Sequence, residues 1–163
     1  MDADLVALSA AVGSACRRHR LLLATAESCT GGWVAQVITH TGGSSEWFER
    51  GFVTYSNEAK TELLGVPAET IRNCGAVSPE TATAMAEGAL QNSKAMISLA
   101  ITGIAGPTGG SPGKPVGTVC FAWCRVGETP VAETARFAGD REAVRRQAVI
   151  HALRGLLRRL DTA

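Results

Sequence analysis

The chain has 163 residues, 45% of them hydrophobic and 19% charged, and a formal net charge of +1. This composition is that of a globular protein with one core, and it excludes an intrinsically disordered chain. The near-neutral charge leaves no overall field that would recruit nucleic acid or a membrane surface, and no apolar run reaches the ~20 residues of a membrane span.

The cysteines and histidines indicate neither a disulfide framework nor a metal site. The five cysteines show no paired CxxC spacing, and the three histidines lack an HExxH-type spacing. The first twenty residues are acidic first and basic last, the reverse of a signal peptide. We therefore predict a cytoplasmic protein without a structural metal.

Hydrophobic periodicity and turn residues predict alternating helices and strands in the first half of the chain. A helix over about Asp2–Arg18 precedes a short buried strand in "LLLATA", and a second helix spans about Trp33–Thr39. "GFVTYS" predicts another strand, and Asn57 is the expected N-cap of the helix in "EAKTELLGV", which Gly65 and Pro67 end.

The second half is expected to begin with a helix capped by Ser78, with Pro79 at its first position. "AMISLAIT" predicts a strand that the glycine-rich "GIAGPTGGSPGKPVG" ends, "TVCFAWCRV" and "VAETARFA" predict two further strands, and Asp140 caps a long last helix. Strands that alternate with helices early and neighbour each other late indicate an α/β fold. We predict three α/β/α layers with a mixed sheet, in a single domain over residues 1–163.

Three predicted strand ends, "AESCTGG", "YSNEAK" and "ITGIAGPTGG", carry reactive side chains, and sites in open α/β sheets form at such ends. Ser28 is either the N-cap of the next helix, a position that Thr30 could fill alone, or a nucleophile. Cys29 is the rival nucleophile, although a small buried hydrophobe is the preferred interpretation of this cysteine. Backbone N–H groups beside the glycines could hold an anion or an oxyanion.

Lys60 falls in the first turn of the helix after the second strand, where the helix dipole disfavours a cation. A general base must be neutral, and lowering a lysine pKa from ~10.4 to ~7.5 takes roughly 4 kcal/mol, whereas the dipole supplies about 0.3–1 kcal/mol. If Lys60 is a base and not a solvated lysine, burial or a second cation must therefore provide most of the shift.

Tyr55 is the only tyrosine of the chain and lies five positions before Lys60. It is either a residue at the core edge or a partner of the amine, since Ser, Lys and Tyr together could activate an alcohol without histidine. In "ITGIAGPTGG", Thr102 offers a hydroxyl, and Gly103 and Gly106 offer accessible backbone for a phosphate, with a wide turn as the alternative.

Six arginines lie between Arg141 and Arg159, without interleaved aromatic residues and not on one narrow helix face. A solvated helix rim accounts for most of them better than a nucleic-acid interface does. Arg141, in the first turn beside Asp140, is expected near an anionic ligand, with Arg145 one turn along.

Six segments together carry a family resemblance: "TAESCTGG", "GSSEWF", "VTYSNEAKTELLGV", "GAVSPETATAMAEGA", "AITGIAGPTGG" and "KPVGTV". In this order they resemble the C-terminal domain of the competence/damage-inducible protein CinA, a family whose stand-alone members are nicotinamide-nucleotide amidohydrolases. The matches cover about Thr25–Val119. Gly42 stands where the family usually has proline, and Glu49 and Arg50 stand where glycine is frequent, all on predicted turns.

The resemblance implies an α/β/α fold and hydrolytic deamidation of nicotinamide mononucleotide to nicotinate mononucleotide and ammonia, a step of pyridine-nucleotide salvage. It implies no metal and no organic cofactor, a small-molecule substrate and a homodimer or higher homo-oligomer. The family's catalytic residues fall on Ser28 as nucleophile, Lys60 as its base and Tyr55 as a group that relays or orients the proton.

The remaining expected contacts are to the substrate. Backbone N–H groups around Thr30 and Gly31 are expected to stabilise the oxyanion, and Thr102, Gly103 and Arg141 to hold the phosphate, with Arg145 as the other candidate arginine. The alternative function is a non-catalytic nucleotide-binding or assembly module linked to competence or the DNA-damage response. Nucleic acid and membranes are not expected partners.

Overall fold

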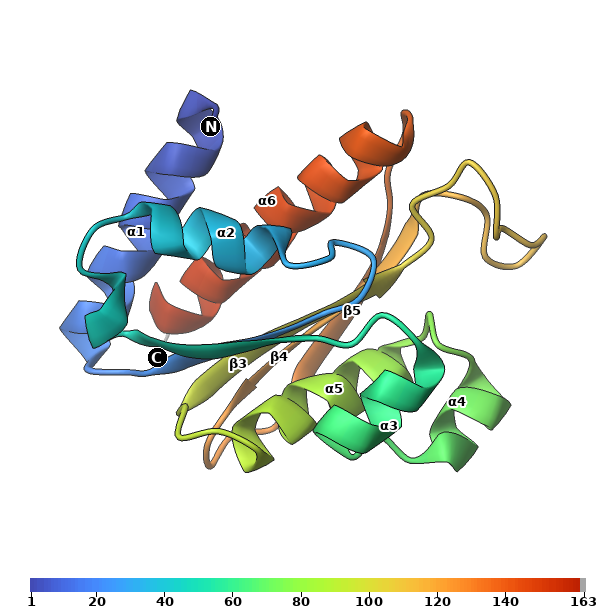
Figure 1. Cartoon of the computed structure of the whole chain (residues 1–163), viewed down its shortest axis with the longest axis horizontal. Helices are drawn as coiled ribbons and strands as arrows, with labels where there is room; N and C mark the ends of the chain where they lie inside the picture. The colour runs from blue at the N-terminus through green and yellow to red at the C-terminus, as the bar shows by residue number, and fades with distance from the viewer. Residues whose placement is uncertain (162–163) are drawn as a thin grey trace.

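Figure 1 shows the computed structural model, which describes residues 1–161 of the chain. Helices and strands alternate as far as β3, and β3, β4 and β5 then follow one another before the last helix. The elements are α1 (Ala3–His19), β1 (Leu23–Glu27), α2 (Trp33–His40), the 3-10 turn η1 (Ser44–Glu46), β2 (Phe48–Val53), α3 (Asn57–Leu64), α4 (Ala68–Cys74), α5 (Pro79–Gln91), β3 (Ile97–Gly103), β4 (Thr118–Arg125), β5 (Val131–Arg136) and α6 (Arg141–Asp161).

The five strands form one mixed sheet in the order β2-β1-β3-β4-β5. Strand β1 pairs in parallel with β2 and β3, whereas β4 pairs antiparallel with β3 and β5. Helices α1, α2 and α6 cover one face of the sheet, and α3, α4 and α5 cover the other (Figure 1). The predicted three-layer α/β/α fold is therefore confirmed.

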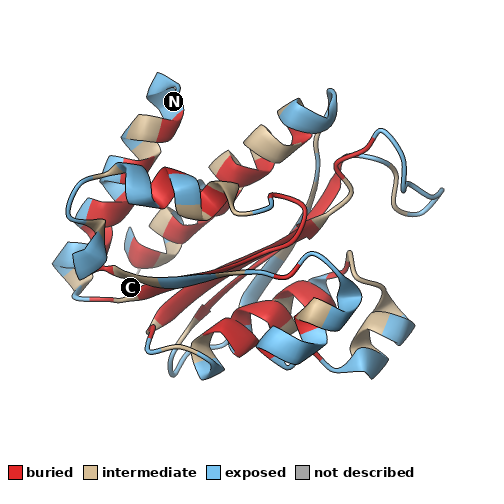
Figure 2. Ribbon diagram, in the orientation of Figure 1, coloured by how far each residue is buried: buried red, intermediate tan, exposed pale blue. Residues whose placement is uncertain are grey.

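The two faces of the sheet are packed differently, because alternate strand residues point to opposite faces. Large side chains face α1, α2 and α6, whereas alanines face α5; the first set includes Leu23, Leu99, Ile101, Phe121 and Trp123, and the second Ala24, Ala26, Ala100 and Ala122. The small residues let α5 lie close to the sheet. Figure 2 shows the central strands β1, β3 and β4 buried between helices whose outward faces are exposed, whereas the edge strands β2 and β5 are largely exposed or half-buried.

A glycine in α5 fixes where α3 lies. A Cβ atom added to Gly88 would come 1.9 Å from the main-chain oxygen of Leu64, so the backbone of α3 can approach α5 only because this position has no side chain. Leu64 itself is fully buried in the core beneath the sheet. The close approach places the inner face of α3, which carries Lys60, against the end of the sheet.

The helix ends follow capping chemistry, with one prediction wrong by a residue. Ser56, not Asn57, is the N-cap of α3: its backbone is extended and its side chain accepts a hydrogen bond from the Ala59 N–H. Ser78 and Asp140 cap α5 and α6 as predicted, by accepting from the backbone N–H three residues on. The short helix α4 was not predicted, since its seven residues are too few for an apolar stripe.

No helix within residues 1–161 is long and apolar enough to cross a membrane.

Candidate active site

The three reactive loops meet at one end of the sheet. Because β2, β1 and β3 run parallel, their carboxyl ends lie side by side, as the loop positions predicted. A hollow of about 320 Å³ opens there, which we call the site hollow. Its walls include six of the predicted site residues: Ser28, Tyr55, Lys60, Thr102, Gly103 and Arg141.

The floor of the site hollow is a serine paired with a lysine. Lys60 Nζ lies 3.0 Å from Ser28 Oγ, 3.0 Å from the main-chain oxygen of Thr54 and 3.2 Å from that of Tyr55. Ser28 follows β1, the two carbonyls follow β2, and Lys60 lies one turn into α3. The sheet register and the α3 cap thus bring the hydroxyl and the amine together.

The environment of Lys60 favours its neutral form. The side chain is 1% exposed, and burial lowers the pKa of its amine below the ordinary value, as a lysine base requires. None of its three oxygen neighbours carries a charge. In the neutral amine, the two N–H bonds can donate to the carbonyls, which leaves the lone pair directed at the Ser28 hydroxyl.

A buried carboxylate, which the sequence interpretation missed, holds the loop that carries Ser28. Glu27 ends β1 and is 1% exposed. It accepts hydrogen bonds from the Thr30 hydroxyl at 2.7 Å and from the backbone N–H groups of Val34 at 2.9 Å and Ala35 at 3.1 Å. Burial raises the pKa of this carboxyl, and these hydrogen bonds oppose the rise.

The Glu27 side chain therefore accepts the hydrogen bonds that an N-cap side chain would accept at the start of α2. The prediction that Ser28 or Thr30 is the N-cap of this helix is wrong. The N-cap position of α2 is Gly32, which has no side chain to cap with. The Ser28 hydroxyl lies toward Lys60 and, at 3.5 Å, toward the main-chain oxygen of Tyr55. A carboxylate at a buried strand end just before a helix was the signal that could have identified this arrangement.

Cys29, the other candidate nucleophile, is a buried residue of the hydrophobic core, as predicted. It is 6% exposed, and burial raises the pKa of its thiol to about 12, so the reactive thiolate is disfavoured. A Cβ atom added to Gly103 would lie 3.1 Å from Cys29 Sγ and 2.8 Å from Val119. The glycine at the end of β3 thus makes room for the loop that carries Ser28 and Cys29.

A further wall of the site hollow is built from the glycine-rich loop and the turn between α4 and α5. The Thr102 hydroxyl, 1% exposed, donates to the main-chain oxygen of Ala76 at 2.8 Å. Lys114 Nζ donates to the main-chain oxygen of Cys74 at 2.9 Å. The first contact joins the end of β3 to the turn after α4, and the second joins the glycine-rich loop to the last residue of α4, so both hold this wall of the site hollow together.

The two candidate arginines of α6 occupy different places. Arg141 lines the site hollow, where its guanidinium donates to the main-chain oxygen of Gly106 at 2.8 Å. Arg145 does not line the site hollow: it donates to the main-chain oxygens of Cys29 at 3.0 Å and Thr30 at 3.3 Å, in the loop that carries Ser28. Its guanidinium also lies over the ring of Trp33, 5.7 Å from the centroid.

The loop residues predicted to hold the oxyanion, Thr30 and Gly31, follow Ser28 but are not among the residues that line the site hollow. The N–H of Gly31 donates to the main-chain oxygen of Ser28 at 3.0 Å, and the Thr30 side chain is fully buried on Glu27. Gly31 has a φ of +59°, which a residue with a side chain rarely adopts, and an added Cβ atom would lie 3.3 Å from Arg145.

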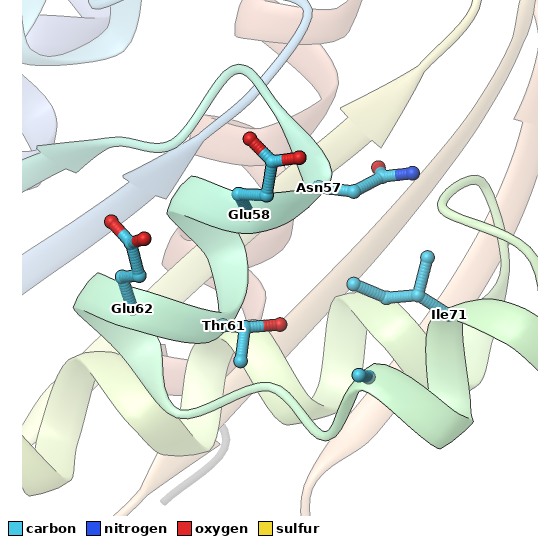
Figure 3. Close-up of a pocket in the computed structure, with 6 residues that line it drawn as sticks. Asn57, Glu58, Thr61, Glu62 and Ile71 are labelled. Atoms are coloured by element: carbon cyan, nitrogen blue, oxygen red, sulfur yellow. The ribbon is translucent and has the colours of Figure 1, made fainter.

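A second hollow, of about 270 Å³, lies on the outer side of α3, between α3 and α4. Figure 3 shows Asn57, Thr61 and Ile71 around it, with the carboxylates of Glu58 and Glu62 rising from α3. It contains no nucleophile beside a base, and its two carboxylates disfavour an anionic ligand. Within residues 1–161, no cluster of three or more histidine, cysteine or acidic side chains is placed to hold a metal.

Comparison with known proteins matches this chain to one family over nearly its whole length. The CinA C-terminal domain model matches residues 5–160. The nicotinamide-nucleotide amidohydrolase PncC of Escherichia coli K12 is 53% identical over 95% of this chain and 94% of its own length. The protein of the same name from Pseudomonas putida is 52% identical over 94% of this chain and 95% of its own.

A solved structure agrees with these sequence relatives. The crystal structure of the competence/damage inducible protein CihA from Agrobacterium tumefaciens superimposes with a TM-score of 0.95 and is 41% identical, covering 99% of this chain and 98% of its own. The family model, the sequence relatives and the shared fold lead to one conclusion: the chain belongs to the CinA C-terminal domain family.

Proposed function

We propose that the protein is a nicotinamide-nucleotide amidohydrolase, which hydrolyses the carboxamide of nicotinamide mononucleotide to nicotinate mononucleotide and ammonia. Two relatives named for this activity are more than 50% identical to it over nearly the full length of both chains. The observation that carries the proposal is the 3.0 Å contact between Lys60 Nζ and Ser28 Oγ at the floor of the site hollow. A buried, neutral amine beside an alcohol can make that alcohol a nucleophile.

In the proposed mechanism, Ser28 Oγ attacks the carboxamide carbon while Lys60 Nζ takes the hydroxyl proton. Lys60 then gives this proton to the nitrogen that leaves as ammonia, which leaves an acyl ester on Ser28. A water molecule, deprotonated by Lys60, attacks the ester carbon, and Lys60 returns that proton to Ser28 as the product leaves as the carboxylic acid, which then releases its own proton to solvent. The cationic pyridinium ring withdraws electrons from the amide, which assists a weakly activated alcohol.

The oxyanion of each tetrahedral intermediate is assigned to backbone N–H groups in the turn before α2, around Thr30 and Gly31. The Gly31 N–H donates to the Ser28 carbonyl in the free protein, so this assignment requires either its release or a contribution from the Thr30 N–H. We propose that Arg141 and the backbone at Thr102 and Gly103 bind the phosphate. The backbone of Thr102 is chosen over its hydroxyl because the hydroxyl already donates to the main-chain oxygen of Ala76.

The test is ammonia release from nicotinamide mononucleotide by the wild type and by Ser28→Ala and Lys60→Met. Each variant should lose at least about 10³-fold in kcat, the scale of a lost nucleophile or general base, while its circular dichroism stays that of the wild type. Lys94→Met, at an exposed lysine in the turn before β3, is the control and should keep full activity.

Turnover at the normal rate in Ser28→Ala or Lys60→Met would remove that residue from the mechanism. A wild type that releases no ammonia, but is stabilised against heat by nicotinamide mononucleotide, would instead support the non-catalytic binding module.

A further inference from the structure

A side-chain bridge crosses the open side of the site hollow. The Arg141 guanidinium donates through one nitrogen to the Tyr55 phenol oxygen at 3.2 Å and through the other to the main-chain oxygen of Gly106 at 2.8 Å. Tyr55 is 62% exposed, and Arg141 is exposed as well. We call the Tyr55 ring, Arg141 and the Gly106 carbonyl the mouth of the site hollow.

The phenol and the main chain of Tyr55 contact different residues of the site hollow. Lys60 Nζ and Ser28 Oγ both approach the main-chain oxygen of Tyr55, at 3.2 and 3.5 Å. The phenol oxygen, at the end of a ring that extends toward solvent, contacts Arg141 instead. A proton leaving Ser28 therefore has Lys60 as its near acceptor, whereas the phenol is placed beside a cation.

This pairing makes a site with two hydrogen-bond donors. Because the phenol oxygen accepts from Arg141, its own O–H proton is directed at another acceptor. A guanidinium N–H and a phenol O–H side by side match two oxygens of a phosphate group, and charge-assisted hydrogen bonds of this kind are strong. Arg145 is committed to the Cys29 and Thr30 carbonyls, and Lys60 is buried at the floor.

We propose that the Tyr55 phenol, together with Arg141, binds the phosphate of the nucleotide and makes the site selective for phosphorylated substrates. Tyr55 is then a specificity-determining residue and not a proton relay. This inference rests on the proposed function for the identity of the substrate, but the donor pair itself is a feature of the free protein.

The test compares nicotinamide mononucleotide with nicotinamide riboside, which lacks only the phosphate, on the wild type, Tyr55→Phe and Arg141→Met. Tyr55→Phe should raise KM for the mononucleotide about tenfold, the scale of one hydrogen bond to a charged group, with kcat within about twofold of the wild type. Its kcat/KM for the riboside should stay within about twofold of the wild type. Arg141→Met should show the same pattern with a larger rise in KM.

Arg136→Met is the matched control, since Arg136 donates to the main-chain oxygen of Gly113 in the same glycine-rich loop but lies outside the site hollow. It should leave both substrates unaffected. An equal fall in kcat for both substrates in Tyr55→Phe would show a proton-relay role and overturn the proposal. An equal rise in KM for both substrates would overturn it as well.

Binding measurements separate this inference from the proposed function. Calorimetric titration of Ser28→Ala, with and without Tyr55→Phe, gives Kd for the mononucleotide, the riboside and inorganic phosphate without any turnover. About tenfold weaker binding of the mononucleotide, with riboside binding unchanged, supports the phosphate contact even if the wild type releases no ammonia. Equal mononucleotide binding by the two proteins overturns the phosphate contact even if the wild type is an active amidohydrolase.

Discussion

The floor and the mouth of the site hollow are built in different ways. The floor consists of Ser28, Lys60 and the main-chain oxygens of Thr54 and Tyr55; its two side chains are 7% and 1% exposed, and main-chain carbonyls hold the amine. The mouth consists of the exposed Tyr55 ring, Arg141 and the Gly106 carbonyl; the Arg141 side chain joins the phenol oxygen of Tyr55 to the main chain of Gly106. The floor is fixed by the sheet and the helices, whereas the mouth can rearrange around a ligand.

Under the proposed function, the floor holds the groups that react and the mouth holds the groups that bind the substrate. A reaction centre gains from groups that stay in place, because charge that develops in the transition state then meets preoriented partners. A binding contact can adjust to its ligand, as we propose for Arg141 and the Tyr55 phenol when they bind the phosphate together. Changes at the floor should therefore alter kcat, stability and pH dependence, and changes at the mouth should alter KM.

The largest expected effect is the pH dependence of the floor. Burial lowers the pKa of Lys60, and only the neutral amine acts as a base. Below that pKa, kcat/KM should rise about tenfold per pH unit, and above it the rate should level off, at a pH under the ordinary lysine value. Measuring kcat/KM from pH 6 to 10 checks this.

Arg141→Met is the control for the pH profile, since Arg141 hydrogen-bonds to Tyr55 and Gly106 and has no hydrogen bond to Ser28 or Lys60. Its profile should run parallel to that of the wild type at lower kcat/KM. The same lysine affects stability: the folded state binds fewer protons than the unfolded state between the lowered pKa and the ordinary one, so the free energy of unfolding should rise with pH in that window. Lys60→Met should remove this contribution, and a rise that persists unchanged would contradict burial as its cause.

The next effect concerns the support of the floor. Glu27→Ala should lower the free energy of unfolding by about 3 kcal/mol, because the Thr30 hydroxyl and two backbone N–H groups of α2 lose a buried charged acceptor. Urea unfolding measures the loss. Glu46→Ala, at an exposed carboxylate paired with Arg17, should cost under about 1 kcal/mol. Equal losses in the two variants would mean that Glu27 does not anchor the loop.

Much of the fold and the floor could be predicted from local sequence. Period and capping residues predicted the strands in "LLLATA" and "AMISLAIT" and the caps Ser78 and Asp140, because these signals act over a few residues. The energetic requirement on Lys60 was also informative: a lysine base needs burial, and the structure buries it.

Contacts that depend on tertiary placement could not be predicted in this way. The Lys60 amine donates to the main-chain carbonyls of Thr54 and Tyr55. Because every residue has such a carbonyl, the amino-acid sequence does not indicate this contact. The contact of Arg145 with the Cys29 carbonyl joins residues 116 positions apart, so the spacing of the arginines could not separate Arg145 from Arg141. The cap of α2 was missed because Glu27 lies before the loop, not at the usual capping position.

The smallest expected effect is that of Arg145→Met. Compared with Arg141→Met, it tests directly whether the floor controls kcat and the mouth controls KM. Arg145→Met removes the donors to the Cys29 and Thr30 carbonyls, which directly follow Ser28, without touching the wall of the site hollow. The loop that carries Ser28 should then lose its fixed position, with kcat for the mononucleotide about tenfold lower and KM within about twofold of the wild type. Arg141→Met should do the opposite. A rise in KM for the mononucleotide in Arg145→Met, with riboside kinetics unchanged, would assign the phosphate to Arg145 and end the distinction between floor and mouth.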